Sequence, residues 1–214
     1  MLKLIGYYNY TVILTYLGLC SGVIGIIQTT THNKPSVGII CLLFSGLCDA
    51  FDGKIANTKK RTDCEKAFGI QIDSLSDIVC FGVLPATICY ASGASSLFSV
   101  IILVAYVLCG LIRLAYYNVT EINRQQTEDV PRTEYLGLPI TVSAIVIPAV
   151  FLVSEVFMQG IHEYIGLLFT FTAAILAAAF IFPFKIKKLM KVGLIVMVSL
   201  GFIFAVSLVV ISFA

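Results

Sequence analysis

Long apolar stretches separated by short polar segments dominate this chain. A membrane core about 30 Å thick is crossed by a helix of roughly 20 apolar residues. Seven stretches reach or approach that length: Thr11–Thr29, Val37–Phe51, Phe68–Ala91, Leu97–Tyr117, Pro139–Phe157, Ile165–Phe182 and Val192–Phe213. The pattern predicts an all-α, polytopic membrane bundle of about six to eight helices. We expect residues 1–214 to form a single domain.

Composition agrees with a membrane protein. Hydrophobic residues make up 59% of the chain and charged residues only 12%, against about 25% charged residues in soluble domains. The seven cysteines are scattered without CxxC or Cys/His spacing, which argues against a disulfide framework and a zinc site. The net charge is only +2, and we expect membrane lipid rather than nucleic acid around the protein.

The distribution of basic residues indicates an orientation. If the N-terminus is cytoplasmic, 13 of the 14 Lys and Arg residues fall on the cytoplasmic side, and only Lys34 falls outside. The polar stretch between the second and third apolar segments then faces the cytoplasm. We therefore expect an integral protein of a bacterial or archaeal cell membrane with a cytoplasm-facing site.

Four aspartates stand out in this hydrophobic sequence. Asp49 and Asp52 are spaced i, i+3, and Asp73 and Asp77 are spaced i, i+4, so each pair lies on one face of its helix. Placing a charged carboxylate within the hydrocarbon core of a membrane is energetically unfavourable unless it binds a cation or faces a polar cavity. Oxygen ligands without His or Cys favour Mg²⁺ or Mn²⁺, and four acids could hold two ions. For Asp63 and Glu65, by contrast, solvated helix ends are the favoured interpretation.

The residues beside the aspartates favour an anionic ligand. Gly53 follows the second aspartate, and Gly69 precedes the third by one helical turn, so a bulky phosphate could approach closely. Positive charge is supplied by Lys54, Lys59, Lys60 and Arg61.

This stretch resembles the signature of the CDP-alcohol phosphatidyltransferase family, Asp-x-x-Asp-Gly-x-x-Ala-Arg, a spacer, then Gly-x-x-x-Asp-x-x-x-Asp. The matching residues are Asp49, Asp52, Gly53, Ala56, Gly69, Asp73 and Asp77. There are two departures. Asn57 stands where the signature has Arg, and the spacer of 11 residues exceeds the usual eight or so.

The resemblance implies a cavity that binds a CDP-linked lipid, CDP-diacylglycerol, with two divalent metal ions. It makes Asp49, Asp52 and Asp73 metal ligands, and Asp77 the general base with a metal contact of its own. The CDP-lipid would be bound by Thr15, Gly53, Lys54, Ala56, Asn57, Lys60, Arg61 and Gly69. For Thr15, simple packing between helices is the favoured alternative. Family members are commonly homodimers, although no motif in this chain indicates one.

Further motifs point to the acceptor alcohol. Three further motifs resemble those of the small integral-membrane phosphatidylserine synthases. They are the run Ser74–Ala86 in the third apolar stretch, Arg113-Leu-Ala-Tyr-Tyr-Asn118, and the turn Gly137-Leu-Pro139. That resemblance implies L-serine as acceptor, with Arg113 and Asn118 binding it. Snorkelling of Arg113 to the headgroups is an equal alternative when that residue is taken alone.

The sequence is compatible with two other functions. A sister enzyme would use glycerol 3-phosphate, an inositol phosphate or another alcohol, and a phosphate-bearing acceptor calls for extra basic residues. An acid-lined cation transporter would more typically carry its acids at mid-membrane on broken helices.

Overall fold

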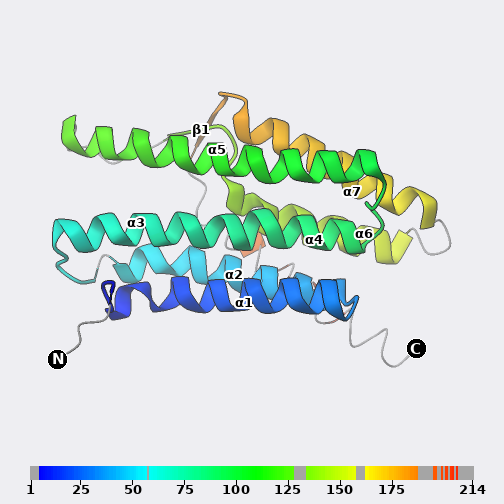
Figure 1. Cartoon of the computed structure of the whole chain (residues 1–214), viewed down its shortest axis with the longest axis horizontal. Coiled ribbons are helices and arrows are strands. Elements are labelled where there is room, and N and C mark those ends of the chain that lie inside the picture. Colours follow the sequence, from blue (N-terminus) through cyan, green and yellow to red (C-terminus); the bar gives the residue numbers. More distant parts are fainter. Residues whose placement is uncertain are drawn as a thin grey trace.

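The computed structural model describes residues 5–56, 58–127, 134–157 and 162–187, together with scattered residues between 195 and 206. Helices dominate the described part of the chain (Figure 1). The helices are α1 (Ile13–Thr31), α2 (Pro35–Ala56), α3 (Asp63–Asp77), α4 (Leu84–Ala91), α5 (Leu97–Thr127), α6 (Ser143–Phe157) and α7 (His162–Ile181). Short 3₁₀ turns, Tyr10–Val12 and Ile140–Val142, lead into α1 and α6, and a π-helical segment, Ile78–Val83, joins α3 to α4.

Five of these helical segments are long and apolar enough to cross a membrane. They are Tyr10–Thr31, Pro35–Ala56, Asp63–Ala91, Leu97–Glu121 and Tyr164–Ile181, and a shorter apolar helix covers Ile140–Val156. The predicted all-helical membrane architecture is therefore confirmed, and the chain is an integral membrane protein. The predicted span Val192–Phe213 lies largely outside the described residues.

Three predicted boundaries were wrong, two of them at the polar stretch and one at the end of α5, which continues past Tyr117 to Thr127. The second apolar helix continues past Phe51 to Ala56, and the third begins at Asp63 rather than Phe68. Apolar runs mark only the lipid-facing part of a helix, whereas polar turns extend it beyond that part. A capping box starts α3: Thr62 accepts a hydrogen bond from the Glu65 amide while Glu65 accepts one from the Thr62 amide.

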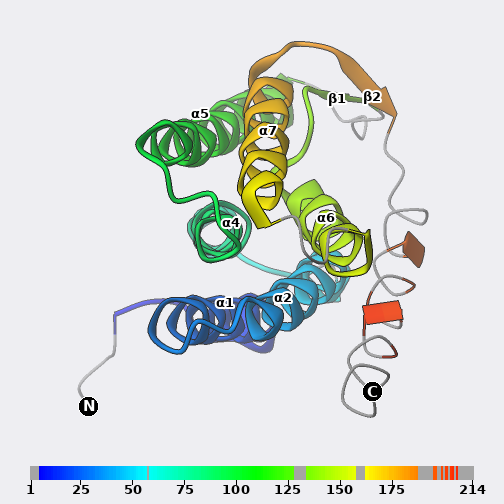
Figure 2. The same cartoon turned by 90° about the vertical axis from the view of Figure 1, so that its right-hand side faces the viewer.

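The continuous α3–α4 helix lies between two groups of helices. Figure 2 shows α4 with the α1–α2 pair on one side and α5 and α7 on the other, while α6 lies beside α2 and α7. Fully buried Leu42, Phe81, Leu84 and Ile88 fill the space around this central helix. Helices α1 and α2 run antiparallel, so Lys34 in their short connection lies at the opposite end of the bundle from the aspartates near the C-terminus of α2.

The π-helical segment follows directly after Asp77. The Leu84 amide bonds to the Val79 carbonyl, five residues earlier. Pro85 has no N–H, so it cannot donate the usual helical hydrogen bond to the Phe81 carbonyl. The buried hydroxyl of Tyr106 on α5 donates to that carbonyl instead, at 2.5 Å, and lies 2.7 Å from Ser143 Oγ at the start of α6. This polar contact therefore joins three helical segments where the central helix is irregular.

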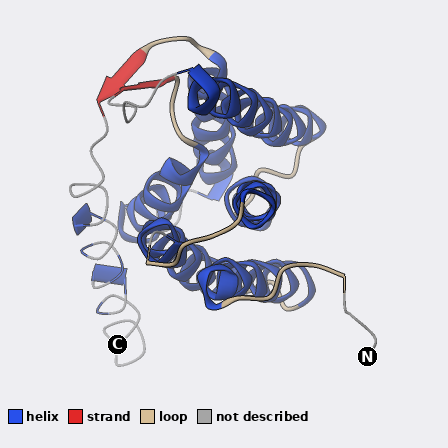
Figure 3. Ribbon diagram, turned by 90° about the vertical axis from the view of Figure 1, so that its left-hand side faces the viewer, coloured by secondary structure: helices blue, strands red, loops and turns tan. Residues whose placement is uncertain are grey.

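A two-stranded antiparallel ribbon was not predicted from the apolar pattern. Strands β1 (Glu134–Leu136) and β2 (Lys185–Lys187) pair at the edge of the bundle (Figure 3). Gly137 follows β1 with a φ of 73°, which suits glycine, and its amide donates to the Phe184 carbonyl at 2.8 Å. The Leu138 amide donates to the Ala179 carbonyl at 3.0 Å. The turn Gly137-Leu138-Pro139, which precedes α6, is thus hydrogen-bonded to the C-terminal end of α7 and the segment after it.

Removing the Tyr106 hydroxyl is expected to destabilise the bundle. Tyr106→Phe leaves the buried Phe81 carbonyl without this donor, so we expect the free energy of unfolding to fall by about 1–3 kcal/mol. Thermal unfolding of the protein in detergent micelles measures the change. Tyr116→Phe on the exposed side of the same helix is the matched control and should unfold like the wild type. Equal stability of the two variants would contradict this account of the π-helical segment.

Candidate active site

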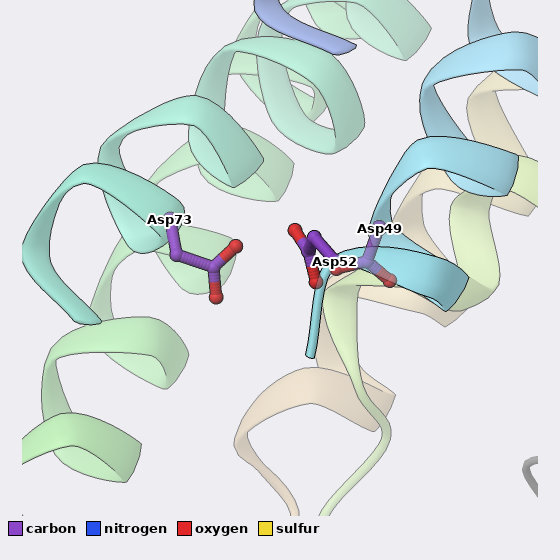
Figure 4. A group of neighbouring side chains, drawn as sticks. All are labelled: Asp49, Asp52 and Asp73. Atoms are coloured by element: carbon purple, nitrogen blue, oxygen red, sulfur yellow. The ribbon is translucent and has the colours of Figure 1, made fainter. Parts of the chain in front are cut away.

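Three aspartates from two helices meet at the polar end of the bundle. Asp49 and Asp52 lie in the last turns of α2, and Asp73 lies on α3. Each offers one carboxylate oxygen, and these oxygens all lie within 4.8 Å of one another. Figure 4 shows Asp73 extending from its helix towards the two aspartates on α2. The helical spacing predicted from the sequence therefore produces two facing sets of carboxylates.

Asp77 completes the set at the same pocket. All four aspartates line this pocket, which has about 200 Å³ of empty space, part of it open to solvent. Asp77 is only 9% exposed and lies one turn beyond Asp73 on α3, next to the π-helical segment. It is not one of the three residues whose oxygens lie within 4.8 Å of one another. Asp77 therefore shares the pocket with the other three carboxylates without belonging to the mutually close group.

The three clustered carboxylates fit a divalent cation. They are half-buried, and three negative charges at this spacing repel one another unless a cation or protons neutralise them. Carboxylate oxygens are the ligands that Mg²⁺ and Mn²⁺ prefer. Although Cys48 and Cys80 also line the pocket, they do not belong to the clustered group. The donor set therefore suits a hard cation rather than zinc.

Thr15 lies in the pocket rather than in a contact made only of packed side chains. Its hydroxyl lies 3.4 Å from Asp52 Oδ2, to which it donates, and its carbonyl accepts a hydrogen bond from Ser76 at 3.4 Å. One turn further along α1, Gly18 also lines the pocket and receives hydrogen bonds on its carbonyl from Ser45 and Cys80. Helix α1 therefore supplies a polar wall as well as a packing surface.

The two signature glycines lie in different surroundings. A Cβ added at Gly53 would meet no atom within 4 Å, so the protein surface is open at this point. A Cβ added at Gly69 would lie 3.2 Å from a guanidinium nitrogen, Nη1 of Arg61. Gly69 therefore makes room for Arg61 on the surface of α3, one turn before Asp73.

The basic residues predicted to bind the CDP-lipid differ in their contacts. Lys54 lies 5.0 Å above the ring of Phe51, and Lys60 is exposed. Ala56 is the half-buried last residue of α2, and Asn57 lies outside the described residues. Of the predicted cations, the structure thus places Arg61 against the helix that carries Asp73.

Asn118 and Arg113, the predicted acceptor residues, do not line the pocket. Asn118 Nδ2 donates to Ser74 Oγ at 2.8 Å, and Ser74 donates back to Oδ1 at 3.1 Å, so Asn118 contacts the residue next to Asp73. Arg113 is buried, 5.4 Å from the Tyr117 ring, with its Nε close to Gly137. The two motifs centred on Arg113 and Gly137 therefore meet in space.

Glu65 is the residue near the site that sequence reasoning undervalued. It was expected to be a solvated helix end, yet its side chain is only 17% exposed and is bonded to Lys59 at 3.1 Å. The Thr62-x-x-Glu65 spacing is a capping-box signal and could have revealed the start of α3. Asp63, the other acid of this turn, is 99% exposed and pairs with Lys66, in agreement with the expected solvated position.

Comparison with known proteins identifies the family. The family model of the CDP-alcohol phosphatidyltransferases matches residues 8–180, which include every aspartate of the pocket. The chain belongs to the CDP-alcohol phosphatidyltransferase family.

Several relatives have names that refer to serine. The chain is 41% identical over 97 residues to the CDP-diacylglycerol–serine O-phosphatidyltransferase of Saccharomyces cerevisiae, covering 44% of this chain and 34% of that protein. The archaetidylserine synthase of Methanothermobacter thermautotrophicus is 31% identical over 141 residues, 65% of this chain and 56% of the relative. The Helicobacter pylori CDP-diacylglycerol–serine O-phosphatidyltransferase is 28% identical over 165 residues, which cover 74% of this chain and 66% of that protein. These matches span 34–66% of the relatives' lengths.

Asp73 is expected to be needed for cation binding. Asp73→Asn removes one of three anionic ligands, so we expect Mn²⁺ affinity to fall by about tenfold or more. Electron paramagnetic resonance titration of the detergent-solubilised protein measures free and bound Mn²⁺. Asp63→Asn, an exposed change on the same helix, should leave the affinity unchanged. Indistinguishable Mn²⁺ affinities for the two variants would exclude this cluster as the metal site.

Proposed function

We propose that this protein transfers the phosphatidyl group of CDP-diacylglycerol to the hydroxyl of L-serine, giving phosphatidylserine and CMP. The observation that carries the proposal is the single pocket that holds all four signature aspartates, three of them clustered as a cation site. Family membership supports the CDP-linked lipid as donor. The serine-specific names of several relatives support serine over glycerol 3-phosphate or an inositol phosphate as acceptor.

On the donor side, the pocket would bind the diphosphate through charge and close approach. Asp49, Asp52 and Asp73 would hold Mg²⁺ or Mn²⁺, which when bound supplies positive charge to the diphosphate and to the departing CMP. Among the basic residues predicted to bind the lipid, Arg61 is the one assigned to the diphosphate, because its guanidinium packs against Gly69 one turn before Asp73. The open surface at Gly53 leaves room for the nucleotide.

Asp77 is suited to the role of general base. The serine oxygen forms a bond to the β-phosphorus, the one that bears the lipid, while the bond from that phosphorus to CMP breaks. Asp77 accepts the proton that the serine hydroxyl loses. Its carboxylate lines the pocket and is not one of the three mutually close carboxylates, so it is the acid of the four that we assign to this proton.

The acceptor residues would act from the side of α5. Asn118 is held by Ser74 beside Asp73, and its amide carries both a donor and an acceptor for the amino acid. Arg113 is buried near Gly137 and does not line the pocket, so its assignment to the serine carboxylate rests on the motif resemblance.

The pocket is proposed to face the cytoplasm. The loop between α2 and α3, which adjoins the aspartates, carries Lys59, Lys60 and Arg61, whereas Lys34 lies at the opposite end of the bundle. This asymmetry is the one expected when the basic end is cytoplasmic.

Serine-dependent release of CMP tests the proposed function. Purified protein in mixed micelles with CDP-diacylglycerol and Mn²⁺ or Mg²⁺ should release CMP when L-serine is added, and not with glycerol 3-phosphate or inositol phosphate. Chromatographic quantification of CMP is the measurement. Release of CMP with glycerol 3-phosphate and none with serine would identify glycerol 3-phosphate as the acceptor. Absence of metal-dependent CMP release with any of these alcohols would reject the transferase function.

Asp77→Asn separates catalysis from donor binding. Without the base, we expect CMP release to fall by about 10²–10⁴-fold, while CDP-diacylglycerol still binds. Activity and equilibrium binding of the lipid are measured on the same preparation, with Asp63→Asn as the active control. Loss of lipid binding together with activity would instead identify Asp77 as a metal ligand required for the site to form.

A further inference from the structure

Glu65 connects three segments at the start of α3. Its Oε2 accepts hydrogen bonds from the Thr62 amide at 2.9 Å and the Thr62 hydroxyl at 3.2 Å. Its Oε1 accepts from Lys59 Nζ at 3.1 Å and from Asn9 Nδ2 at 3.3 Å. One carboxylate therefore links the N-terminal segment, the loop between α2 and α3, and the first turn of α3.

Glu65 lies on the same helical face as the site. Glu65, Gly69 and Asp73 follow one another at intervals of four residues, so they form one stripe along α3. The eight residues from Glu65 to Asp73 correspond to about 12 Å along the helix. Because both oxygens of Glu65 already accept hydrogen bonds, this residue differs from the aspartates that can bind a cation.

Arg61 lies in the part of the loop that Glu65 holds. Lys59 precedes Arg61 and Thr62 follows it, and both are bonded to Glu65. The Arg61 guanidinium lies against Gly69, between Glu65 and Asp73 on the stripe. The bond from the Thr62 amide therefore holds the backbone directly after Arg61, and the ion pair holds the side chain of Lys59 two residues before it.

The N-terminal segment braces the same loop at further points. The Tyr10 hydroxyl and Thr58 Oγ1 are 3.0 Å apart, and the rings of Tyr7 and Phe68 are 5.5 Å apart. Phe68 precedes Gly69, so this contact lies next to the position of Arg61. The N-terminal segment therefore contacts both the loop, at Thr58, and α3, at Phe68.

We infer that Glu65 is a positioning residue, which holds the α2–α3 loop so that Arg61 presents its guanidinium to the diphosphate of a CDP-linked lipid. The inference rests on the proposed function for the identity of that lipid. A guanidinium makes paired hydrogen bonds with phosphate oxygens, and these depend strongly on its orientation. A loop that is ordered before binding also avoids the entropy cost of ordering it in the complex.

A double-mutant cycle between Glu65 and Arg61 tests the inference. Equilibrium binding of CDP-diacylglycerol in mixed micelles with Mn²⁺ is measured for wild type, Arg61→Ala, Glu65→Ala and the double variant. Arg61→Ala should weaken binding by about ten- to a hundredfold, since a hydrogen bond to a charged group is lost. Glu65→Ala should also weaken binding, but should have little further effect once Arg61 is absent.

Further variants separate positioning from general stability. Glu65→Gln keeps an oxygen for the Thr62 amide but loses the ion pair with Lys59, so it should weaken binding less than Glu65→Ala and again only when Arg61 is present. Asp63→Ala, in the same turn, should bind the lipid like the wild type. Mn²⁺ affinity should stay unchanged in the Glu65 variants, and KM for the lipid should change more than kcat.

The outcomes also distinguish this inference from the proposed function. Independent, multiplicative effects of Glu65 and Arg61, or unchanged lipid binding in Glu65→Ala, would overturn the positioning role. A wild type that binds CDP-diacylglycerol but releases no CMP with serine would reject the proposed reaction, while a coupled cycle would still support the positioning role. A wild type that does not bind this lipid at all would overturn both.

Discussion

Mutual repulsion among Asp49, Asp52 and Asp73 is the constraint around which this end of the molecule is built. Three carboxylate oxygens within 4.8 Å of one another are unfavourable unless positive charge is present, and half-burial increases the cost. Such an arrangement persists only if the surrounding helices hold it in place. Helices α2 and α3 supply the acids, and α1 adds hydrogen bonds through Thr15. Helices α1, α2 and α3 together therefore hold a site that favours a divalent cation.

The central helix connects this site to the rest of the bundle. Helix α3 continues through the π-helical segment into α4, so the segment that holds Asp73 and Asp77 is anchored deep between the other helices. The Tyr106 hydroxyl bonds to the Phe81 carbonyl where Pro85 removes the regular helical donor. Irregular turns of this kind are frequent at functional sites, and here one begins directly after Asp77.

The charges around the pocket fall into two groups. Lys59 and Lys66 form ion pairs with Glu65 and Asp63, so these cations contribute to the start of α3. Arg61 lies instead on Gly69, on the face that leads to Asp73. Cations that are paired with acids at the start of a helix contribute less charge to a ligand, so Lys59 and Lys66 are less available to the pocket than Arg61.

The sequence by itself determined the helical membrane class and the acidic site, because both depend on local periodicity. Apolar runs of sufficient length predict spanning helices, and the i, i+3 and i, i+4 spacings place each pair of aspartates on one helical face. Only the tertiary structure decided that Asp49, Asp52 and Asp73 form the mutually close group and that Asn118 reaches Ser74. It also decided that Gly137 fastens the approach to α6 onto the end of α7, and that Glu65 is bonded to Asn9, 56 residues away. These features depend on contacts between segments distant in the chain, which leave no periodic pattern in the sequence.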